Sequence, residues 1–169
     1  LPNFCLRVRL SLLRDIGATQ SPHNSWLLIQ TLETLGLRVD KHSDNTLEVA
    51  KFLESHPKVK AVNYPGLPSN KYYAKAQKYF KGGKSSGLIS FDVESFEEAK
   101  RIIDSVKLFS VVVNIGDSKS LITHPASTTH SQMSPEELIK AGVNPVTVRL
   151  SIGLENPIDL IEDLTQALN

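Results

Sequence analysis

The stretch "VTVRLSIGLENPIDLIEDLTQAL", residues 146–168, contains the patterns of a strand and of a helix in direct succession. In its first part, Val146, Val148, Leu150 and Ile152 alternate with other residues, which places them on one face of a strand. The Asn-Pro pair that follows is typical of a helix start, because asparagine caps the first N–H groups and proline fits the first turn. The stretch therefore predicts one strand followed by one helix.

The same succession recurs upstream. Strands are predicted at 58–65, 86–93, 109–116 and 146–153, and helices at 70–80, 95–106, 134–142 and 156–168. The helix starts at Ser95 and Ser134 each have glutamate three residues later, which is the capping-box pattern. Short strands joined by helices predict an α/β fold, a two-layer sandwich with a four-stranded sheet and helices on one face.

The N-terminal third is expected to be helical. "FCLRVRLSLLRDIG", residues 4–17, fits either a strand or a helix, and we favour a helix that ends at Gly17. Ser21 followed by Pro22 then predicts the start of a long helix. An apolar stripe runs along this helix at Leu28, Leu32, Leu35 and Val39.

The helical pattern ends before Pro57, which divides the chain in two. We expect residues 1–55 to form a helical arm that packs on something outside the compact unit, and residues 56–169 to form the α/β domain. The first residues, "LPNFCLRVRL", lack a methionine and indicate a piece of a longer protein.

Composition excludes several classes of protein. Hydrophobic residues make up 40% of the 169 and charged residues 22%, as in ordinary globular domains. A net charge of +1 gives no support to binding of nucleic acid, and no apolar run approaches the roughly 20 residues that span a membrane. A single cysteine, Cys5, and no signal-peptide pattern indicate a cytoplasmic location.

No metal site or nucleophilic triad is predicted. A zinc site needs three or four converging ligands, and the histidines show no such spacing: His23, His42, His56, His124 and His130. "KGGKSSG", residues 81–87, lacks the spacing of a phosphate loop and is predicted to be a surface turn.

Two polar residues remain open to two interpretations. Arg149 shares a strand face with Thr147 and Ser151, and is either solvated or a binding group for an anion, since guanidinium matches a carboxylate bidentately. Asn114 ends a strand beside a glycine and is either a turn former or a binding residue. The residues alone do not decide between these readings.

Three long segments carry a resemblance to a known family. The segments at 21–69, at 113–130 ("VNIGDSKSLITHPASTTH") and at 134–168 resemble the C-terminal domain of the Cys/Met-metabolism enzymes that use pyridoxal phosphate. Within that family, "VNIGDSKSL" is most similar to the O-acetylhomoserine sulfhydrylases. The methionine γ-lyases and cystathionine enzymes typically carry serine where this chain has Asn114.

The resemblance implies the C-terminal domain of a fold-type I pyridoxal-phosphate enzyme and assigns roles to several residues. It implies that Arg149 binds the α-carboxylate of an amino-acid substrate, that Asn114 assists, and that Ser120 with Leu121 lines the substrate side. His124 and the proline after it are expected to shape the loop.

The resemblance also implies what this chain lacks. The lysine that bonds the cofactor, the aspartate at the ring nitrogen and the phosphate ligands belong to the family's N-terminal domain. Lys119 of this chain lies in the wrong motif to be that lysine. We therefore expect no catalytic or cofactor-binding residue in this chain, and no activity without the missing domain. The intact enzyme is expected to be a tetramer that makes homocysteine or methionine from O-acetylhomoserine and sulfide or methanethiol, by γ-replacement on pyridoxal 5'-phosphate.

Other functions stay open. Within the family these are a cystathionine γ-synthase, a cystathionine γ-lyase or a methionine γ-lyase, against which Asn114 argues. Outside it they are a non-catalytic amino-acid-binding domain or an assembly module, since a fold alone does not define a function.

Overall fold

The computed structural model describes residues 2–169. The chain forms two compact units that divide between Gly36 and Leu37, which is earlier than the expected boundary after residue 55. The difference lies in helix α4, Leu35–Ser55, whose C-terminal half is part of the second unit's core. Its inward-facing side chains are fully buried there: Val49, Ala50 and Leu53.

The first unit is helical. It contains α1 (Pro2–Arg7), a π-helical segment (Val8–Leu13), α2 (Arg14–Ile16) and α3 (Pro22–Glu33). The expectation of a helix before Gly17 is confirmed, and that glycine has the left-handed conformation, with φ of 68°. Many large apolar side chains of this unit are exposed, among them Phe4, Leu10, Ile16, Trp26, Ile29 and Leu32.

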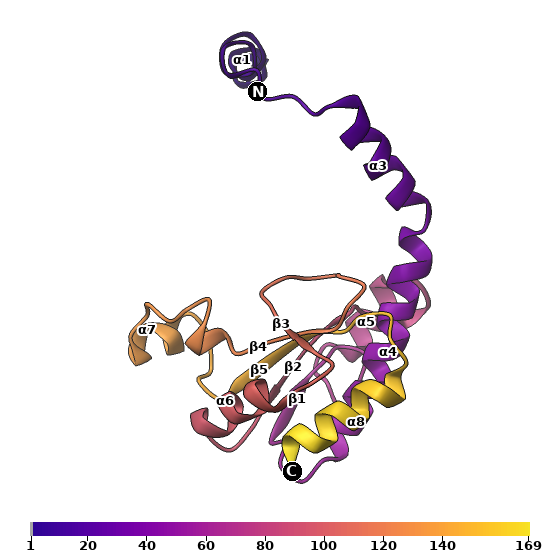
Figure 1. Cartoon of the computed structure of the whole chain (residues 1–169), viewed down its shortest axis with the longest axis vertical. Coiled ribbons are helices and arrows are strands. Elements are labelled where there is room, and N and C mark those ends of the chain that lie inside the picture. The colour runs from indigo at the N-terminus through magenta and orange to yellow at the C-terminus, as the bar shows by residue number, and fades with distance from the viewer. Residues whose placement is uncertain (1) are drawn as a thin grey trace. The chain divides into compact units, whose positions relative to one another are not determined.

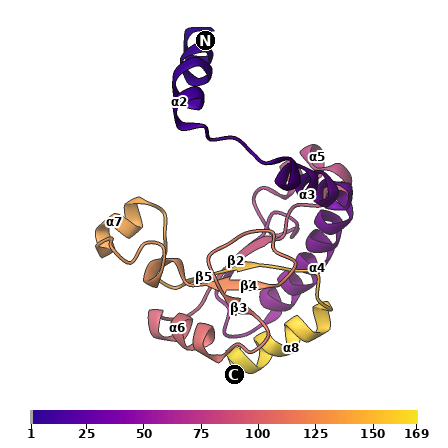
Figure 2. The same cartoon turned by 45° about the horizontal axis from the view of Figure 1, so that its top comes forward.

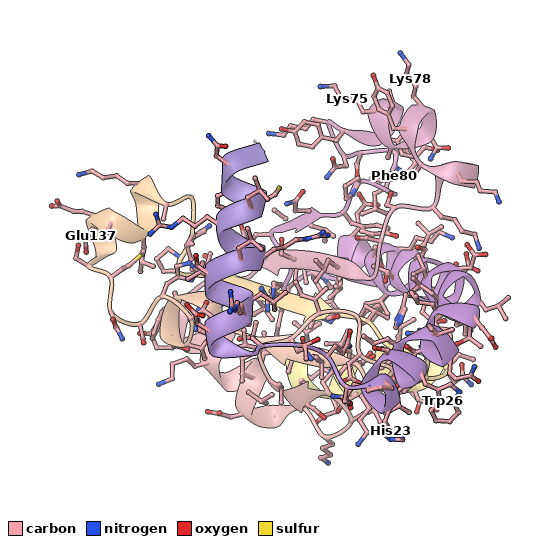
Figure 3. The ribbon with its side chains drawn as sticks, turned by 90° about the horizontal axis from the view of Figure 1, so that it is seen from above. His23, Trp26, Lys75, Lys78, Phe80 and Glu137 are labelled. Atoms are coloured by element: carbon pink, nitrogen blue, oxygen red, sulfur yellow. The ribbon has the colours of Figure 1, made fainter. Side chains whose placement is uncertain are left out.

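The helix start predicted in this unit is also found. The Ser21 hydroxyl accepts a hydrogen bond from the N–H of Asn24 at 3.2 Å, which caps α3. One turn into the helix, the rings of His23 and Trp26 lie with their centroids 5.8 Å apart (Figure 3). The helix end at Gly17 and the helix start at Ser21 are thus as predicted, but the long helix predicted from Pro22 is divided at Thr34 into α3 and α4.

The second unit contains a five-stranded sheet in the order β1-β2-β5-β4-β3. Its strands are β1 (Ala61–Asn63), β2 (Leu88–Asp92), β3 (Ser110–Val111), β4 (Leu121–Thr123) and β5 (Thr147–Ser151). Neighbouring strands are antiparallel except for β3 and β4, which are parallel. The prediction of four strands missed β4, and the strand expected at 109–116 is reduced to two residues because residues 112–119 leave the sheet as an exposed loop.

Three helices cover one face of the sheet; helices on one face were predicted, but α4 was expected to pack outside this unit. Helices α4, α6 (Phe96–Ser105) and α8 (Pro157–Leu168) lie along the same side of the strands (Figure 1, Figure 2). Each fully buried leucine or isoleucine there contributes about 1.5–3 kcal/mol of hydrophobic stabilisation. The large side chains of this core include Leu53, Ile89, Phe91, Ile102, Ile122, Leu150, Ile152, Leu160 and Leu164.

The predicted caps at the later helices are present. The Ser95 hydroxyl accepts the N–H of Glu98 at 3.1 Å, and Asn156 accepts the N–H of Ile158 at 3.1 Å. At α7, Pro135–Lys140, the Glu137 carboxylate accepts the N–H of Ser134 at 2.8 Å, and this backbone hydrogen bond lowers the pKa of Glu137. Figure 3 shows Glu137 at the periphery of the unit.

The remaining helices are short. Helix α5, Tyr73–Tyr79, carries Lys75 and Lys78 on the outside of the unit (Figure 3). It leads into a 3-10 turn at Lys81–Gly83, in the segment predicted to be a surface turn. No helix within residues 2–169 has the combination of length and apolar character that crossing a bilayer requires.

The two faces of the sheet differ in burial. Along β2 and β5, Ile89, Phe91, Val148 and Leu150 point to the helices and are buried, whereas the residues between them are only partly covered. This alternation is the one predicted from the period-two pattern. The face away from the helices is therefore where polar side chains such as Arg149 remain accessible.

Candidate functional site

Arg149 lies at the centre of the accessible sheet face. Its Cα is paired with that of Ser90 in β2 on one side and that of Thr123 in β4 on the other. The residues before and after it, Val148 and Leu150, are fully buried among the core side chains. An inner strand held on both sides by hydrogen bonds and below by packing is a rigid support for a binding group.

A cavity of about 460 Å³ opens in front of Arg149. Arg149 is the only lining residue that is charged at every ordinary pH, and none of the lining residues is a carboxylate or a lysine. The side chains and backbone that line it belong to Asn63, Pro65, Tyr72, Leu88, Ile89, Ser90, Pro125, Thr129, His130, Gly142, Val143, Asn144, Thr147 and Arg149.

The carboxylate of Asp92, on the neighbouring strand β2, is already hydrogen-bonded to neutral groups. Asp92 accepts hydrogen bonds from the Thr147 hydroxyl and, at 3.2 Å, from the Asn144 amide. Among residues 2–169, none donates to, accepts from or forms an ion pair with the Arg149 guanidinium. A half-buried guanidinium without a protein partner can bind a carboxylate through two parallel hydrogen bonds.

The two histidines of the "HPASTTH" loop lie in different environments. His124 is buried; its Nε2–H donates to the carbonyl of Pro145 at 2.7 Å, and its Nδ1 is hydrogen-bonded to the Ser127 hydroxyl at 2.8 Å. With both nitrogens bonded inside the protein, His124 holds the loop against the segment before β5. His130, in contrast, lines the Arg149 cavity.

Asn114 does not line this cavity. It lies in the exposed loop between β3 and β4, and its side-chain oxygen accepts the N–H of the next residue, Ile115, at 2.9 Å. Two residues further on, the N–H of Gly116 donates to the Ser151 hydroxyl at 3.0 Å, which fastens the loop to the end of β5. The structure thus places Asn114 on a segment bound to the strand of Arg149.

Ser120 lies inside the protein, which differs from the expectation that it lines the substrate side. It is 0% exposed, and its hydroxyl donates to the Glu155 carboxylate at 2.8 Å. Its N–H donates to the other carboxylate oxygen at 2.6 Å, and its Oγ accepts the N–H of Gly153 at 2.8 Å. The hydrogen-bonding capacity of Ser120 is therefore used within the chain.

Sequence reasoning missed Glu155 and the residues that support it. Asn45 of α4 donates to the carbonyls of Gly153 at 3.0 Å and of Glu155 at 2.7 Å. His42, one turn earlier, contacts the carbonyl of Ile152 through Nδ1 at 2.6 Å. No spacing rule connects residues about 110 positions apart in the chain, so only the three-dimensional structure reveals this group.

The cavity does not fit a site for covalently bound pyridoxal phosphate. It has neither a lysine to bond the aldehyde nor a carboxylate to pair with the ring nitrogen. Within residues 2–169 there is also no group of three histidine, cysteine or acidic side chains that could hold a metal ion. What the described residues fit is a small organic anion.

The sequence of the chain belongs to the class of sulfur-amino-acid enzymes that use pyridoxal phosphate. The family described as Cys/Met metabolism PLP-dependent enzyme matches residues 4–169, and the chain is a member of it. The family identified from the sequence is thereby confirmed.

Its relatives are similar along almost the whole of this chain. It is 51% identical to the O-acetyl-L-homoserine sulfhydrylase of Leptospira meyeri over 98% of this chain and 38% of that protein. It is 47% identical to O-acetyl-L-homoserine sulfhydrylase 1 of Thermus thermophilus, again over 98% of this chain and 39% of that protein. The chain thus spans less than two fifths of the length of these relatives.

Solved structures give the same result. A putative O-acetylhomoserine (thiol)-lyase from Campylobacter jejuni matches with a TM-score of 0.89 and 57% identity, over 99% of this chain and 40% of that one. That structure contains a lysine linked to the pyridoxyl phosphate group. The O-acetylhomoserine sulfhydrylase of Wolinella succinogenes matches with a TM-score of 0.80 and 36% identity, over 98% of this chain and 44% of that one.

Proposed function

We propose that this chain is the C-terminal part of a pyridoxal-phosphate-dependent O-acetylhomoserine sulfhydrylase, and that Arg149 binds the α-carboxylate of the substrate. The observation that carries the proposal is the Arg149 guanidinium, which is half-buried, without a protein partner, and the only permanent charge in its cavity. The names of the relatives support the choice of O-acetylhomoserine.

The chain contributes binding and orientation to the reaction. Pyridoxal phosphate, held by another part of the longer protein, supplies an electron sink for the loss of protons from the substrate carbons. Two hydrogen bonds from the planar guanidinium fix the carboxylate in one plane, which sets the direction of the Cα–H bond. Such orientation can lower a barrier by several kcal/mol, roughly 7–11 at the most.

Asn114 has a secondary role in this proposal. Its loop is fastened beside β5 through Gly116 and Ser151, so its amide can assist the carboxylate that Arg149 binds. Acetate leaves from Cγ of the substrate, and sulfide or methanethiol takes its place, giving homocysteine or methionine. We further propose that the enzyme is a cytoplasmic homo-oligomer, in which the exposed apolar side chains of the first unit are covered.

The decisive experiment substitutes Arg149 in the longer enzyme. Arg149→Lys retains the charge but loses the bidentate geometry. We therefore expect kcat/KM for O-acetylhomoserine to fall, by an amount that corresponds to about 1–3 kcal/mol of lost transition-state stabilisation. Arg14→Lys, at an exposed arginine of the first unit, is the matched control. Equal kinetics for the two variants would remove Arg149 from the site.

A second experiment tests the location of the cofactor. The 169-residue chain is mixed with pyridoxal phosphate, reduced with borohydride and weighed by mass spectrometry. No stoichiometric adduct is expected, because no lysine lines the cavity. A single reduced adduct on one lysine would contradict the assignment of the cofactor to another part of the protein.

A further inference from the structure

Glu155, itself partly buried, is the centre of a polar cluster that also contains the buried residues Ser120, Asn45 and Gly153, and that the proposed chemistry does not use. Its two carboxylate oxygens accept the N–H and the hydroxyl of Ser120 at 2.6 and 2.8 Å. The Ser120 Oγ in turn accepts the N–H of Gly153 at 2.8 Å, and Asn45 donates to the carbonyls of Gly153 and Glu155. We name these four residues the Glu155 cluster.

The Glu155 cluster joins two segments that are distant in the sequence. One is the loop at 112–120, which carries Asn114 and whose residues up to 119 are exposed. The other is the segment that leaves β5 just after Arg149. Among the described residues, two further hydrogen bonds connect the two segments. The N–H of Gly116 donates to the Ser151 hydroxyl at 3.0 Å, and the N–H of Leu154 donates to the carbonyl of Ser118 at 2.9 Å.

Close packing at Gly153 shows how tightly these segments meet. A Cβ at this position would lie 2.4 Å from the carbonyl oxygen of Ser118 and 2.3 Å from the Glu155 carboxylate. These distances are too short for any side chain, so the loop and the strand end touch through their backbones. Any shift of the Ser120 anchor therefore moves the loop relative to β5.

We propose that Glu155 is a positioning residue, which through Ser120 and Gly153 sets the loop of Asn114 against the strand of Arg149. The inference rests on the proposed function, because Asn114 and Arg149 matter together only if both bind the substrate carboxylate. Glu155 is not among the residues that line the cavity. Its role is to hold the side chains of Asn114 and Arg149 in fixed positions relative to the substrate carboxylate.

A carboxylate suits this role better than an amide. It is an acceptor only, so it can take the N–H and the O–H of Ser120 at the same time. Glutamine would keep only one of the two side-chain oxygens, so either the N–H or the O–H of Ser120 would lose its acceptor. Glu155→Gln should therefore weaken the cluster, and Glu155→Ala should remove it.

The test measures steady-state kinetics of the longer enzyme with each substrate varied in turn. Glu155→Ala should raise KM for O-acetylhomoserine about tenfold, the effect of one lost charge-assisted hydrogen bond. KM for sulfide should not change, because sulfide has no carboxylate. Glu155→Gln should give a smaller rise, and Glu162→Ala, at an exposed glutamate of α8, should give none.

A double-mutant cycle identifies the route of the effect. In an Asn114→Ala background, Glu155→Ala should change KM for O-acetylhomoserine by less than about twofold, because coupled residues are not additive. Circular dichroism shows which variants are folded; if Glu155→Ala is not, Glu155→Gln replaces it in every comparison.

Three results would overturn the inference. They are kinetics of the Glu155 variant equal to those of Glu162→Ala, a parallel rise of both KM values, or full additivity with Asn114→Ala. The proposed function is judged separately, by Arg149→Lys. If that variant raises KM for O-acetylhomoserine and the Glu155 variant does not, only the positioning role of Glu155 is lost.

Discussion

Replacement of Asp163 by asparagine should destabilise the second unit in a way that depends on pH. Asp163 lies on α8, is 7% exposed, and accepts hydrogen bonds from the segment that connects α6 to β3. The donors are the N–H groups of Lys107 at 2.9 and 3.1 Å, of Leu108 at 2.8 Å and of Phe109 at 3.2 Å, and the amide of Gln166 at 3.0 Å.

The magnitude follows from the donors that an amide cannot satisfy. In Asp163→Asn the remaining oxygen can accept from Leu108 and Phe109, but the NH₂ group then faces the N–H of Lys107 and the amide of Gln166, which are also donors. A hydrogen bond to a charged group contributes about 1.5–3 kcal/mol. Lys107 is exposed, so water compensates part of the loss, and we expect the free energy of unfolding to fall by about 2 kcal/mol.

The pH dependence has a definite sign. Burial acts to raise the pKa of Asp163, but the three backbone N–H donors and Gln166 outweigh it, so the pKa in the folded protein lies below the ordinary value of 3.8. The stabilisation by the carboxylate is therefore complete above that ordinary value and is lost as the pH falls through the folded-state pKa. The stability difference between wild type and Asp163→Asn should shrink below about pH 4.

Urea unfolding of the 169-residue chain, followed by circular dichroism at several pH values, measures this difference. Asp104→Asn, at an exposed aspartate of α6, is the control and should change stability by less than about 0.5 kcal/mol. A difference between wild type and Asp163→Asn that stays constant or grows toward acid pH would refute the role assigned to the carboxylate.

Three further substitutions test the packing and the caps by the same unfolding measurement. Gly153→Ala should destabilise by about 1–3 kcal/mol, because its Cβ would meet the backbone of Ser118 and Lys119, whereas Gly36→Ala, with no atom within 4 Å, should be neutral or slightly stabilising. Leu53→Ala removes a fully buried side chain and should cost about 2–5 kcal/mol, whereas Leu37→Ala, at 74% exposure, should cost much less. Ser95→Ala should cost about 1 kcal/mol through loss of the α6 cap, and an unchanged urea midpoint would contradict that role.

The elements that sequence reasoning predicted correctly are those that depend on neighbouring residues. The cap at Ser134 and the left-handed Gly17 are satisfied within a few residues. The alternation of Val148 and Leu150 with Arg149 requires only that one face of the strand be buried. In these places local preference and tertiary packing favour the same structure.

The missed elements depend on distant partners. Strand β4, Leu121–Thr123, is buried on both faces, so it has no alternation to identify it. Conversely, Val112 and Val113 favour a strand by residue type, yet they are about half exposed and lie outside the sheet. Residue type alone could not show where the pairing of β3 with β4 would end.

Ser120 and Arg149 show why the candidate site could be only partly predicted. Both are polar residues, and residue type alone does not distinguish an internal role from a binding role. In the structure Ser120 is 0% exposed, its N–H and hydroxyl donate to Glu155, and its hydroxyl oxygen accepts from Gly153. Buried hydroxyls in proteins are usually hydrogen-bonded, and these bonds give Ser120 an internal role.

Arg149 is in the opposite situation. Its guanidinium is half-buried in a cavity without another permanent charge, and no described residue bonds to it. Its strand neighbours, in contrast, are fully packed, so the backbone beneath it is fixed. A cation that is held rigidly but left without a protein partner makes its hydrogen bonds to water or to an anion from outside. The distinction between structural and binding residues therefore comes from counting their hydrogen bonds, which requires the positions of residues far apart in the sequence.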